Sequence, residues 1–336
     1  MQIESDPEVT PPKICVVIPA YKVSKHILGL LAKIGPEVGA IYVVDDSCPE
    51  KTGELVIKYC ADSRVHVIYH LKNQGVGGAV MTGYRSALKD GAEIIVKLDG
   101  DGQMDPRMIP RIIRPIVKEQ ADYTKGNRFF NIERIREMPI LRILGNLALS
   151  FFSKLSSGYW QIFDPNNGFT AINSKTAEQL PLNKISSRYF FESDMLLRLN
   201  LMRAVVVDVP MDAFYGDETS NLRLRSSVFE FAGKHIRNAF KRILYSYYLR
   251  EFNLASIELP LGTGLCIFGL VVGIRSWMHS FQYGIATQPG TLILIAMSFL
   301  SGLQLLLGFF AYDIANVPRE AISGSLHGTS SDVGQL

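Results

Sequence analysis

The sequence has few cysteines, little net charge and no apolar run at its start. Each of these absences argues against one kind of protein. Four cysteines stand in 336 residues. None forms a C-x-x-C pair or a spacing that suits a zinc site, so we expect reduced thiols that pack in a cytosolic compartment. The net charge of +3 is too small to indicate a nucleic acid as partner. Residues 1–13 are polar, and we expect no signal peptide there.

Hydrophobic residues make up 47% of the chain, and the excess lies near its C-terminal end. The stretches 257–278 and 290–312 are each apolar and long enough to cross a bilayer as a helix. The alternative is a pair of buried helices in a soluble domain, which the length of the runs and the flanking Trp277 and Tyr312 disfavour. We therefore predict a transmembrane hairpin over residues 256–314.

Basic residues predict how this hairpin is oriented. The connection 279–289 carries no Lys or Arg, whereas residues 223–250 carry seven. By the positive-inside rule, the N-terminal domain and the tail 315–336 are cytoplasmic, in a protein of the plasma or inner membrane. Residues 223–255 also place apolar side chains at helical spacing among the basic ones. This pattern suits a basic amphipathic helix on the membrane surface, or an ordinary surface helix that packs on the domain.

The N-terminal part alternates short β-branched apolar runs with helical patterns. Such alternation predicts βαβ crossovers and a buried, mostly parallel sheet. We expect a Rossmann-like α/β domain over residues 13–222. The expected strands are ICVVIPA, AIYVVDD, VHVIYH, EIIVK and AVVVDVPM, and the expected helices cover 24–34, a stretch from Thr52, 77–89 and 193–202.

Polar residues follow these strands, where ligands of open α/β sheets bind. Asp99, Asp101 and Gln103 come directly after EIIVKL. Two carboxylates at i and i+2 are hard oxygen ligands, and Mg²⁺ takes such ligands together with substrate phosphates. A metal and diphosphate site is one interpretation of this D-x-D, and a solvated acidic turn is the other.

Two further features accompany the early strands. Asp45 and Asp46 end the second strand, where a carboxylate can bind a nucleotide base or ribose, cap a helix, or do both. The glycine cluster that begins at Gly75 opens a helix, and its backbone amides could approach a phosphate. Tight turns use the same residues, and no P-loop Lys-Ser/Thr follows.

Six segments carry a family resemblance. They are PAYK (19–22), VVDDSCPEKT (43–52), KNQGVGGAVMTG (72–83), LDGDGQMDP (98–106), KGNRF (125–129) and NNGFTAI (166–172). Together they resemble family 2 glycosyltransferases with a GT-A fold, over about residues 13–220. The hairpin makes the chain most similar to the branch of dolichol-phosphate mannose synthases and bactoprenol glucosyltransferases.

The resemblance implies an inverting transfer of a hexose from a nucleotide diphosphate sugar to polyprenyl phosphate at the cytoplasmic membrane face. A UDP sugar is the favoured donor, and a GDP sugar is the alternative. It implies Mg²⁺ or Mn²⁺ as cofactor. On the donor side, the positions that match are Asp99, Asp101 and Gln103 for the metal and diphosphate, Pro19, Ala20, Tyr21 and Gly75 for the nucleotide sugar, and Asp46 for the base.

On the acceptor side, Arg128 and Arg142 match arginines that would grip the acceptor phosphate, as planar guanidinium forks can. For both, a salt bridge on a basic surface is the alternative. Asp164, Glu192 and Asp194 match acidic positions, one of which would act as base or orient the acceptor. A phosphate acceptor is already anionic, so it needs little proton abstraction, whereas a hydroxyl acceptor needs a true general base.

The chain departs from the family pattern at a few positions, which leave the donor sugar open. The usual Tyr-Asn pair is Tyr21-Lys22, and residues 215–222 read YGDETSNL. Two other functions stay open as well: transfer to a glycan or glycolipid hydroxyl, and a non-catalytic scaffold that binds nucleotide sugar. Self-association through the hairpin is also expected, because small residues permit close helix contact. The glycines concerned are Gly262, Gly264, Gly269 and Gly273.

Overall fold

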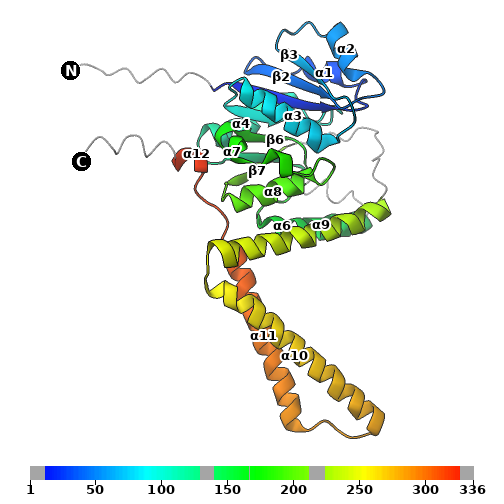
Figure 1. The fold of residues 1–336 in the computed structure, drawn as a ribbon, viewed down its shortest axis with the longest axis vertical. Helices are drawn as coiled ribbons and strands as arrows, with labels where there is room; N and C mark the ends of the chain where they lie inside the picture. The colour runs from blue at the N-terminus through cyan, green and yellow to red at the C-terminus, as the bar shows by residue number, and fades with distance from the viewer. Residues whose placement is uncertain (1–11, 129–139, 166, 212–223, 326–336) are drawn as a thin grey trace, which may run out of the picture. The chain divides into compact units, whose positions relative to one another are not determined.

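The structure is a computed structural model that describes residues 12–128, 140–165, 167–211 and 224–325 (Figure 1). The chain forms two compact units. One comprises Met1–Asn238 with Pro318–Leu336, and the other comprises Ala239–Val317. All four cysteines lie in the described part and are free thiols, as expected.

Within the described residues, the first unit contains one sheet of seven strands in the order β3-β2-β1-β4-β6-β5-β7. β1 pairs in parallel with β2 and β4, while β6 is antiparallel to both β4 and β5. The predicted mostly parallel sheet is confirmed. The strands are β1 (Ile14–Ala20), β2 (Val38–Asp45), β3 (Val65–Tyr69), β4 (Ile94–Lys97), β5 (Tyr123–Asn127), β6 (Thr170–Asn173) and β7 (Val206–Pro210).

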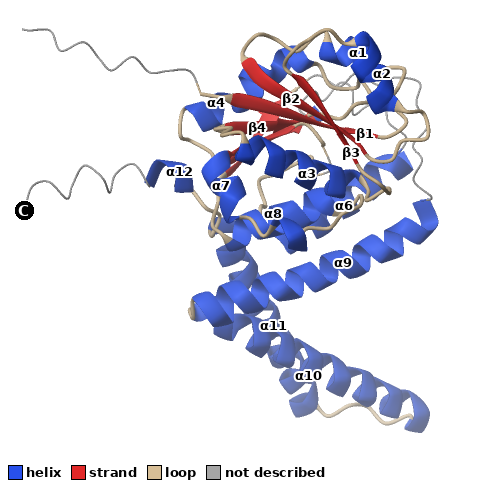
Figure 2. Ribbon diagram, turned by 45° about the horizontal axis from the view of Figure 1, so that its top comes forward, coloured by secondary structure: helices blue, strands red, loops and turns tan. Residues whose placement is uncertain are grey.

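Helices cover both faces of this sheet (Figure 2). The helical pattern predicted over 24–34 forms only the short α1, because the backbone around Val23 makes a turn first. The helices of the first unit are α1 (Ile27–Leu31), α2 (Thr52–Tyr59), α3 (Val76–Lys89), η1 (Pro106–Met108), α4 (Ile109–Val117), α6 (Ile140–Ser157), α7 (Ser174–Gln179), η3 (Leu182–Lys184), α8 (Phe191–Leu201) and α12 (Ile322–Ser325).

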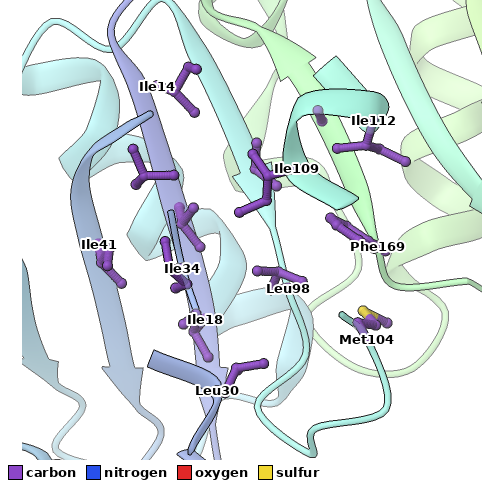
Figure 3. Packing of buried hydrophobic residues seen from close by; sticks show 14 of the residues in the cluster. Ile14, Ile18, Leu30, Ile34, Ile41, Leu98, Met104, Ile109, Ile112 and Phe169 are labelled. Atoms are coloured by element: carbon purple, nitrogen blue, oxygen red, sulfur yellow. The ribbon is translucent and has the colours of Figure 1, made fainter. Parts of the chain in front are cut away.

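Side chains of β1 alternate between the two faces, as strand geometry requires. Ile18 packs in the core with Leu30 beside it and Ile109 of α4 on the same face (Figure 3). Val17 faces the other way, where it lies against Gly83 of α3 so closely that a Cβ at that glycine would overlap it. Burial on both faces explains why these strands read as continuous apolar runs.

Helix α9 (Leu224–Leu244) exposes some of its apolar side chains and buries several polar ones. Ile236 and Phe240 are 61% and 70% exposed, whereas His235, Asn238 and Arg242 are buried. The helix also packs on the first unit, where the centre of the Phe190 ring lies 5.8 Å from that of Phe231 and 4.9 Å from that of His235. The membrane-surface helix and the helix packed on the domain therefore both stay predictions for this segment.

The second unit is dominated by two long helices, α10 (Leu254–Tyr283) and α11 (Pro289–Ala315), which follow the π-helix η4 (Tyr245–Arg250). Both are longer than the predicted spans, and among the described helices they are the ones long and apolar enough to cross a membrane. Their packing is close because Gly262 of α10 meets the backbone at Gly302 of α11. Near the ends of the hairpin, Arg242 forms a buried ion pair with Asp313, at 2.6 and 2.9 Å.

The chain returns to the first unit after the hairpin. Asp122, which is fully buried, accepts hydrogen bonds at 3.0 Å from the backbone N–H groups of Ile322 and Ser323, and one at 2.8 Å from that of Val205. Ala321 packs against Ala121 and Val205. The polar sequence of residues 323–336 would predict a disordered tail. Ser323 is nevertheless buried, because its backbone N–H and its hydroxyl both donate hydrogen bonds to the Asp122 carboxylate.

Candidate active site

The D-x-D loop begins where β4 ends. Asp101 Oδ1 accepts a hydrogen bond from the backbone N–H of Gln103 at 3.0 Å, which closes a tight turn. Gly100 packs against the end of β1: a Cβ there would lie 2.9 Å from Val23 Cγ2 and 3.3 Å from the carbonyl oxygen of Pro19. The structure thus brings the predicted metal motif and the predicted nucleoside loop together.

The nucleoside loop itself is partly exposed. Ala20 is buried and Tyr21 is 44% exposed. Lys22 has a φ of +58°, a left-handed conformation that costs a side chain roughly 1 kcal/mol unless it is Gly, Asn or Asp. This conformation gives a physical reason for the asparagine of the usual Tyr-Asn pair, and Lys22 adopts it here without that advantage.

The side chains of the D-x-D loop offer only oxygen ligands. Among the described residues, no group of three or more His, Cys, Asp or Glu side chains gathers as a metal site. Asp99, Asp101 and Gln103 could supply two carboxylates and one amide, so phosphate oxygens of a substrate would have to complete the shell. This incomplete oxygen set fits Mg²⁺ or Mn²⁺, which commonly share their coordination with a diphosphate.

Asp46 is buried and organises the loop before α3. Its carboxylate accepts hydrogen bonds from the backbone N–H groups of Gln74 and Gly75, at 2.8 and 2.7 Å, and contacts His70 Nδ1 at 2.7 Å. Binding of a base by Asp46 stays a prediction. Asp45 meanwhile accepts the N–H of Gly53 in the first turn of α2 at 2.7 Å. It does so from the end of β2, because the N-cap position of α2 is Lys51 and not a residue of the Asp-Asp-Ser motif.

Gly75 serves close backbone packing. Its φ is +88°, and a Cβ there would lie 2.6 Å from the carbonyl oxygen of Ser187. Gly77 likewise packs on the carbonyl of Ser186. The start of α3 therefore fits against residues 186–187, and this packing accounts for both glycines without a phosphate.

Arg128 and Asp164, both predicted to act on the acceptor, form a bidentate ion pair. Arg128 Nε and Nη2 lie 2.8 and 3.1 Å from the two carboxylate oxygens. Asp164 is buried, whereas the side chain of Arg128 is 28% exposed. The structure thus brings these two predicted residues together. Arg142 lies in α6, but its side chain falls outside the described residues.

Asp208 of β7 adjoins this pair and was missed in the sequence. It accepts a hydrogen bond from Asn127 Nδ2 at 3.0 Å and one from the N–H of Phe163 at 2.8 Å. Burial raises the pKa of Asp208 to about 6. An acid inside the apolar run AVVVDVPM was the available signal, because a charge in a buried strand needs a partner.

Two buried lysines beside the site were also missed. Lys97 Nζ lies 2.6 Å from Asp99 Oδ1 and 3.6 Å from Glu192 Oε1. Burial opposes the charge of Lys97, yet the two acids raise its pKa above the ordinary value. Lys125 donates to the carbonyl of Asn167, and burial lowers its pKa to about 8. The sequence offered a signal for Lys97, which lies in the apolar strand IIVK, but not for Lys125, which lies in the polar strand YTKGN.

The two acids predicted on α8 have different surroundings. Glu192 lies next to Lys97, and burial raises its pKa against the opposing effect of both buried lysines. Asp194 accepts the N–H of Ser186 at 2.9 Å and contacts Arg198 at 3.5 Å. Asp194 thus holds the loop on which Gly77 packs.

The chain was compared with known proteins. Residues 15–180 match the model of glycosyl transferase family 2. The chain is 30% identical to UDP-N-acetylglucosamine–dolichyl-phosphate N-acetylglucosaminyltransferase of Methanococcus voltae, over 60% of this chain and 86% of the relative. It is 29% identical to the undecaprenyl-phosphate mannosyltransferase of Micrococcus luteus, over 59% and 82%.

Among solved structures, glucosyl-3-phosphoglycerate synthase of Mycobacterium tuberculosis, in complex with Mn²⁺, UDP-glucose and phosphoglyceric acid, is similar at a TM-score of 0.51 and 18% identity. The match covers 69% of this chain and 79% of that one. This likeness supports the GT-A-like fold. With the sequence matches and the D-x-D loop at the end of β4, it leads to one assignment: the chain belongs to glycosyl transferase family 2.

Proposed function

We propose that this glycosyltransferase moves a hexose from a nucleoside diphosphate sugar to polyprenyl phosphate, with inversion, at the cytoplasmic face of a membrane. The observation that carries the proposal is the presence, in one chain, of an oxygen-only D-x-D site and of two apolar helices of membrane-spanning length. The first feature suits a dissolved nucleoside diphosphate donor, and the second suits a lipid acceptor. Relatives named for dolichyl and undecaprenyl phosphate acceptors support the same reaction.

On the donor side, Asp99, Asp101 and Gln103 would hold Mg²⁺ or Mn²⁺ against the diphosphate. The ion, when bound, supplies positive charge that stabilises the leaving diphosphate. Pro19, Ala20 and Tyr21 would line the nucleoside, and Asp46 would contact the base or shape its loop. Gly75 would contribute through the backbone at the start of α3.

On the acceptor side, the guanidinium of Arg128 would bind the acceptor phosphate. Its pairing with Asp164 fixes the direction of the fork before the acceptor arrives. A phosphate oxygen then attacks the anomeric carbon as the bond to the diphosphate breaks. Because that oxygen is already anionic, positioning matters more than proton removal. Arg142 would be a second phosphate ligand, and Asp164 or Glu192 would orient the acceptor rather than remove a proton.

The test is an assay of the full chain in membranes with polyprenyl phosphate, Mg²⁺ or Mn²⁺, and a panel of UDP and GDP sugars. We expect a sugar-phosphate lipid that is lost, by about 10²-fold or more, in Asp101→Asn. Asp105→Asn is the matched control, because Asp105 lies in the same loop but caps η1 through Arg107. Sugar transfer to a hydroxyl acceptor alone, or full activity of Asp101→Asn, would contradict the proposal.

A further inference from the structure

Lys97 is a buried cation that touches the metal motif. It is the last residue of β4 and is 1% exposed. Its ammonium lies 2.6 Å from Asp99 Oδ1, 3.6 Å from Glu192 Oε1 and 5.2 Å from the centre of the Phe191 ring. Burial of an ammonium costs free energy unless oppositely charged partners are held beside it. Lys97, Asp99 and Glu192 therefore form one charged cluster.

Gly168 confines the same carboxylate from another side. A Cβ at Gly168 would overlap both Asp99 Oδ2 and Lys97 Nζ. One oxygen of Asp99 is therefore held by the ammonium, and the other lies against the Gly168 backbone. The side chain of Asp99 is nevertheless 28% exposed. Its carboxylate is thus held in one orientation at the surface of the site.

We propose that Lys97 is a positioning residue for the transfer reaction. Its ammonium holds the first carboxylate of the D-x-D motif in place and reduces the negative charge that this motif presents to a divalent ion. Glu192 shares the ammonium and sets how strongly it acts on Asp99. The inference rests on the proposed function, in which the motif binds Mg²⁺ or Mn²⁺.

The charges around Lys97 predict how its removal changes cation affinity, which a purely structural role would not predict. Asp99, Asp101 and Glu192 bring three carboxylates together, and Lys97 is the ammonium that contacts Asp99 and Glu192. The second buried lysine, Lys125, acts on Glu192 and is unchanged in the variants. Removal of Lys97 leaves a more negative site, which attracts a divalent cation more strongly at short range. It also frees Asp99 to leave its productive orientation, which slows the chemical step. Cation affinity and turnover therefore change in opposite senses.

The experiment measures binding of Mn²⁺ to the full chain in detergent, with UDP or GDP present, by electron paramagnetic resonance of the free ion. We expect Lys97→Met to bind Mn²⁺ about tenfold more tightly. At saturating Mn²⁺, the same variant turns over at least tenfold more slowly. Unchanged or weaker binding of Mn²⁺ in this variant would overturn the inference.

Glu192→Gln tests the opposite sign and carries the experiment if Lys97→Met does not fold. It removes a negative charge and leaves Lys97 to Asp99 alone, so Mn²⁺ binding becomes several-fold weaker. Asp105→Asn is the matched control, because it removes a carboxylate close to the D-x-D motif that binds Arg107 instead, and it leaves Mn²⁺ affinity unchanged.

The outcomes separate this inference from the proposed function. If the wild type binds Mn²⁺ and forms the lipid product, but all variants share its Mn²⁺ affinity, the role of Lys97 is refuted and the proposed function stands. If the wild type binds no Mn²⁺ with either nucleotide, both fall. Equal losses of activity and of thermal stability, without a change in Mn²⁺ affinity, would show a structural role only.

Discussion

At the scale of single residues, Gly168 shows why the NNGF segment carries a glycine. The Asp99–Lys97 pair occupies the space that a side chain at this position would need. We expect Gly168→Ala to lower turnover by about 10²-fold, because a displacement of about 1 Å in a catalytic group has that effect. The assay is initial rate at saturating donor.

Gly29→Ala is the control for this substitution. Gly29 lies in α1, and a Cβ there meets no atom within 4 Å. It should leave the rate unchanged and stabilise the fold slightly. If Gly168→Ala kept the wild-type rate, the confinement of Asp99 would have no role in turnover.

A second prediction for single residues concerns Arg128. Arg128→Lys keeps the charge but loses the planar fork that pairs with Asp164. We expect the KM for polyprenyl phosphate to rise about tenfold, with a smaller change in the KM for the donor. Arg107→Lys, at an exposed pair with Asp105, should change neither constant. An equal rise in both KM values for Arg128→Lys would place Arg128 outside the acceptor site.

The sequence identified residues in recognisable motifs and missed those whose role depends on distant parts of the chain. Asp99, Asp101 and Gln103 follow a strand directly and could be predicted. Asp208 was visible as an acid in AVVVDVPM, but its pairing with Asn127 could not be predicted, because that partner lies 81 positions away. Lys97 was visible in EIIVK, but its pairing with Glu192 requires α8 to pack beside β4.

At the scale of elements, the hairpin helices depend on glycine at their contact. A Cβ at Gly262 would lie 2.9 Å from the carbonyl oxygen of Gly302 and 3.0 Å from Leu305 Cβ. We expect Gly262→Leu to destabilise the protein by about 1–3 kcal/mol through overpacking. Thermal unfolding in detergent would measure this.

Gly264 provides the matched control, because a Cβ there meets nothing within 4 Å in the chain. Gly264→Leu should leave the melting temperature unchanged. Gly262 and Gly269 were expected to serve self-association, and the structure uses both within one chain. Lowered stability in Gly264→Leu would instead indicate that a second copy packs on that face.

His235 of α9 predicts a pH dependence of stability. It contacts Ser156 Oγ at 2.7 Å, and burial lowers its pKa from 6.5 to about 4. Between these values the unfolded chain binds a proton that the folded chain does not. The contribution of neutral His235 to the free energy of unfolding is therefore fully present above pH 6.5, and it is lost as the pH falls towards 4.

The measurement is the melting temperature in detergent across this pH range. We expect His235→Gln to show a smaller decrease than the wild type, since glutamine does not titrate. The corresponding control is an exposed histidine, as in His279→Gln, whose decrease should match that of the wild type. Identical curves for wild type and His235→Gln would show that other groups cause the acid sensitivity.

Periodicity predicted most elements because burial on both faces makes a strand apolar throughout, and this signal is local. The helix 77–89 was observed as α3 at Val76–Lys89, and the strand AIYVVDD as β2. The antiparallel direction of β6 was not predictable. It depends on how the chain returns between β4 and β5, which no local pattern records.

At the scale of the whole molecule, the proposed orientation can be tested with cysteines introduced into a background without the four native ones. Ala286, between α10 and α11, and Lys118, after α4, are both exposed. We expect a membrane-impermeant maleimide to label Ala286→Cys in intact cells, and Lys118→Cys only after permeabilisation, as the positive-inside rule predicts. Labelling of Lys118→Cys in intact cells would reverse the orientation.

The contact between Asp122 and residues 322–323 makes the hairpin an insertion within the catalytic unit rather than a terminal appendage. A soluble enzyme made by ending the chain at Asn238 would remove the two backbone donors at Ile322 and Ser323 from a fully buried carboxylate. Each lost hydrogen bond to a charged group costs about 1.5–3 kcal/mol. A soluble version should therefore excise Ala239–Val317 and rejoin the chain through a linker that keeps residues 318–325.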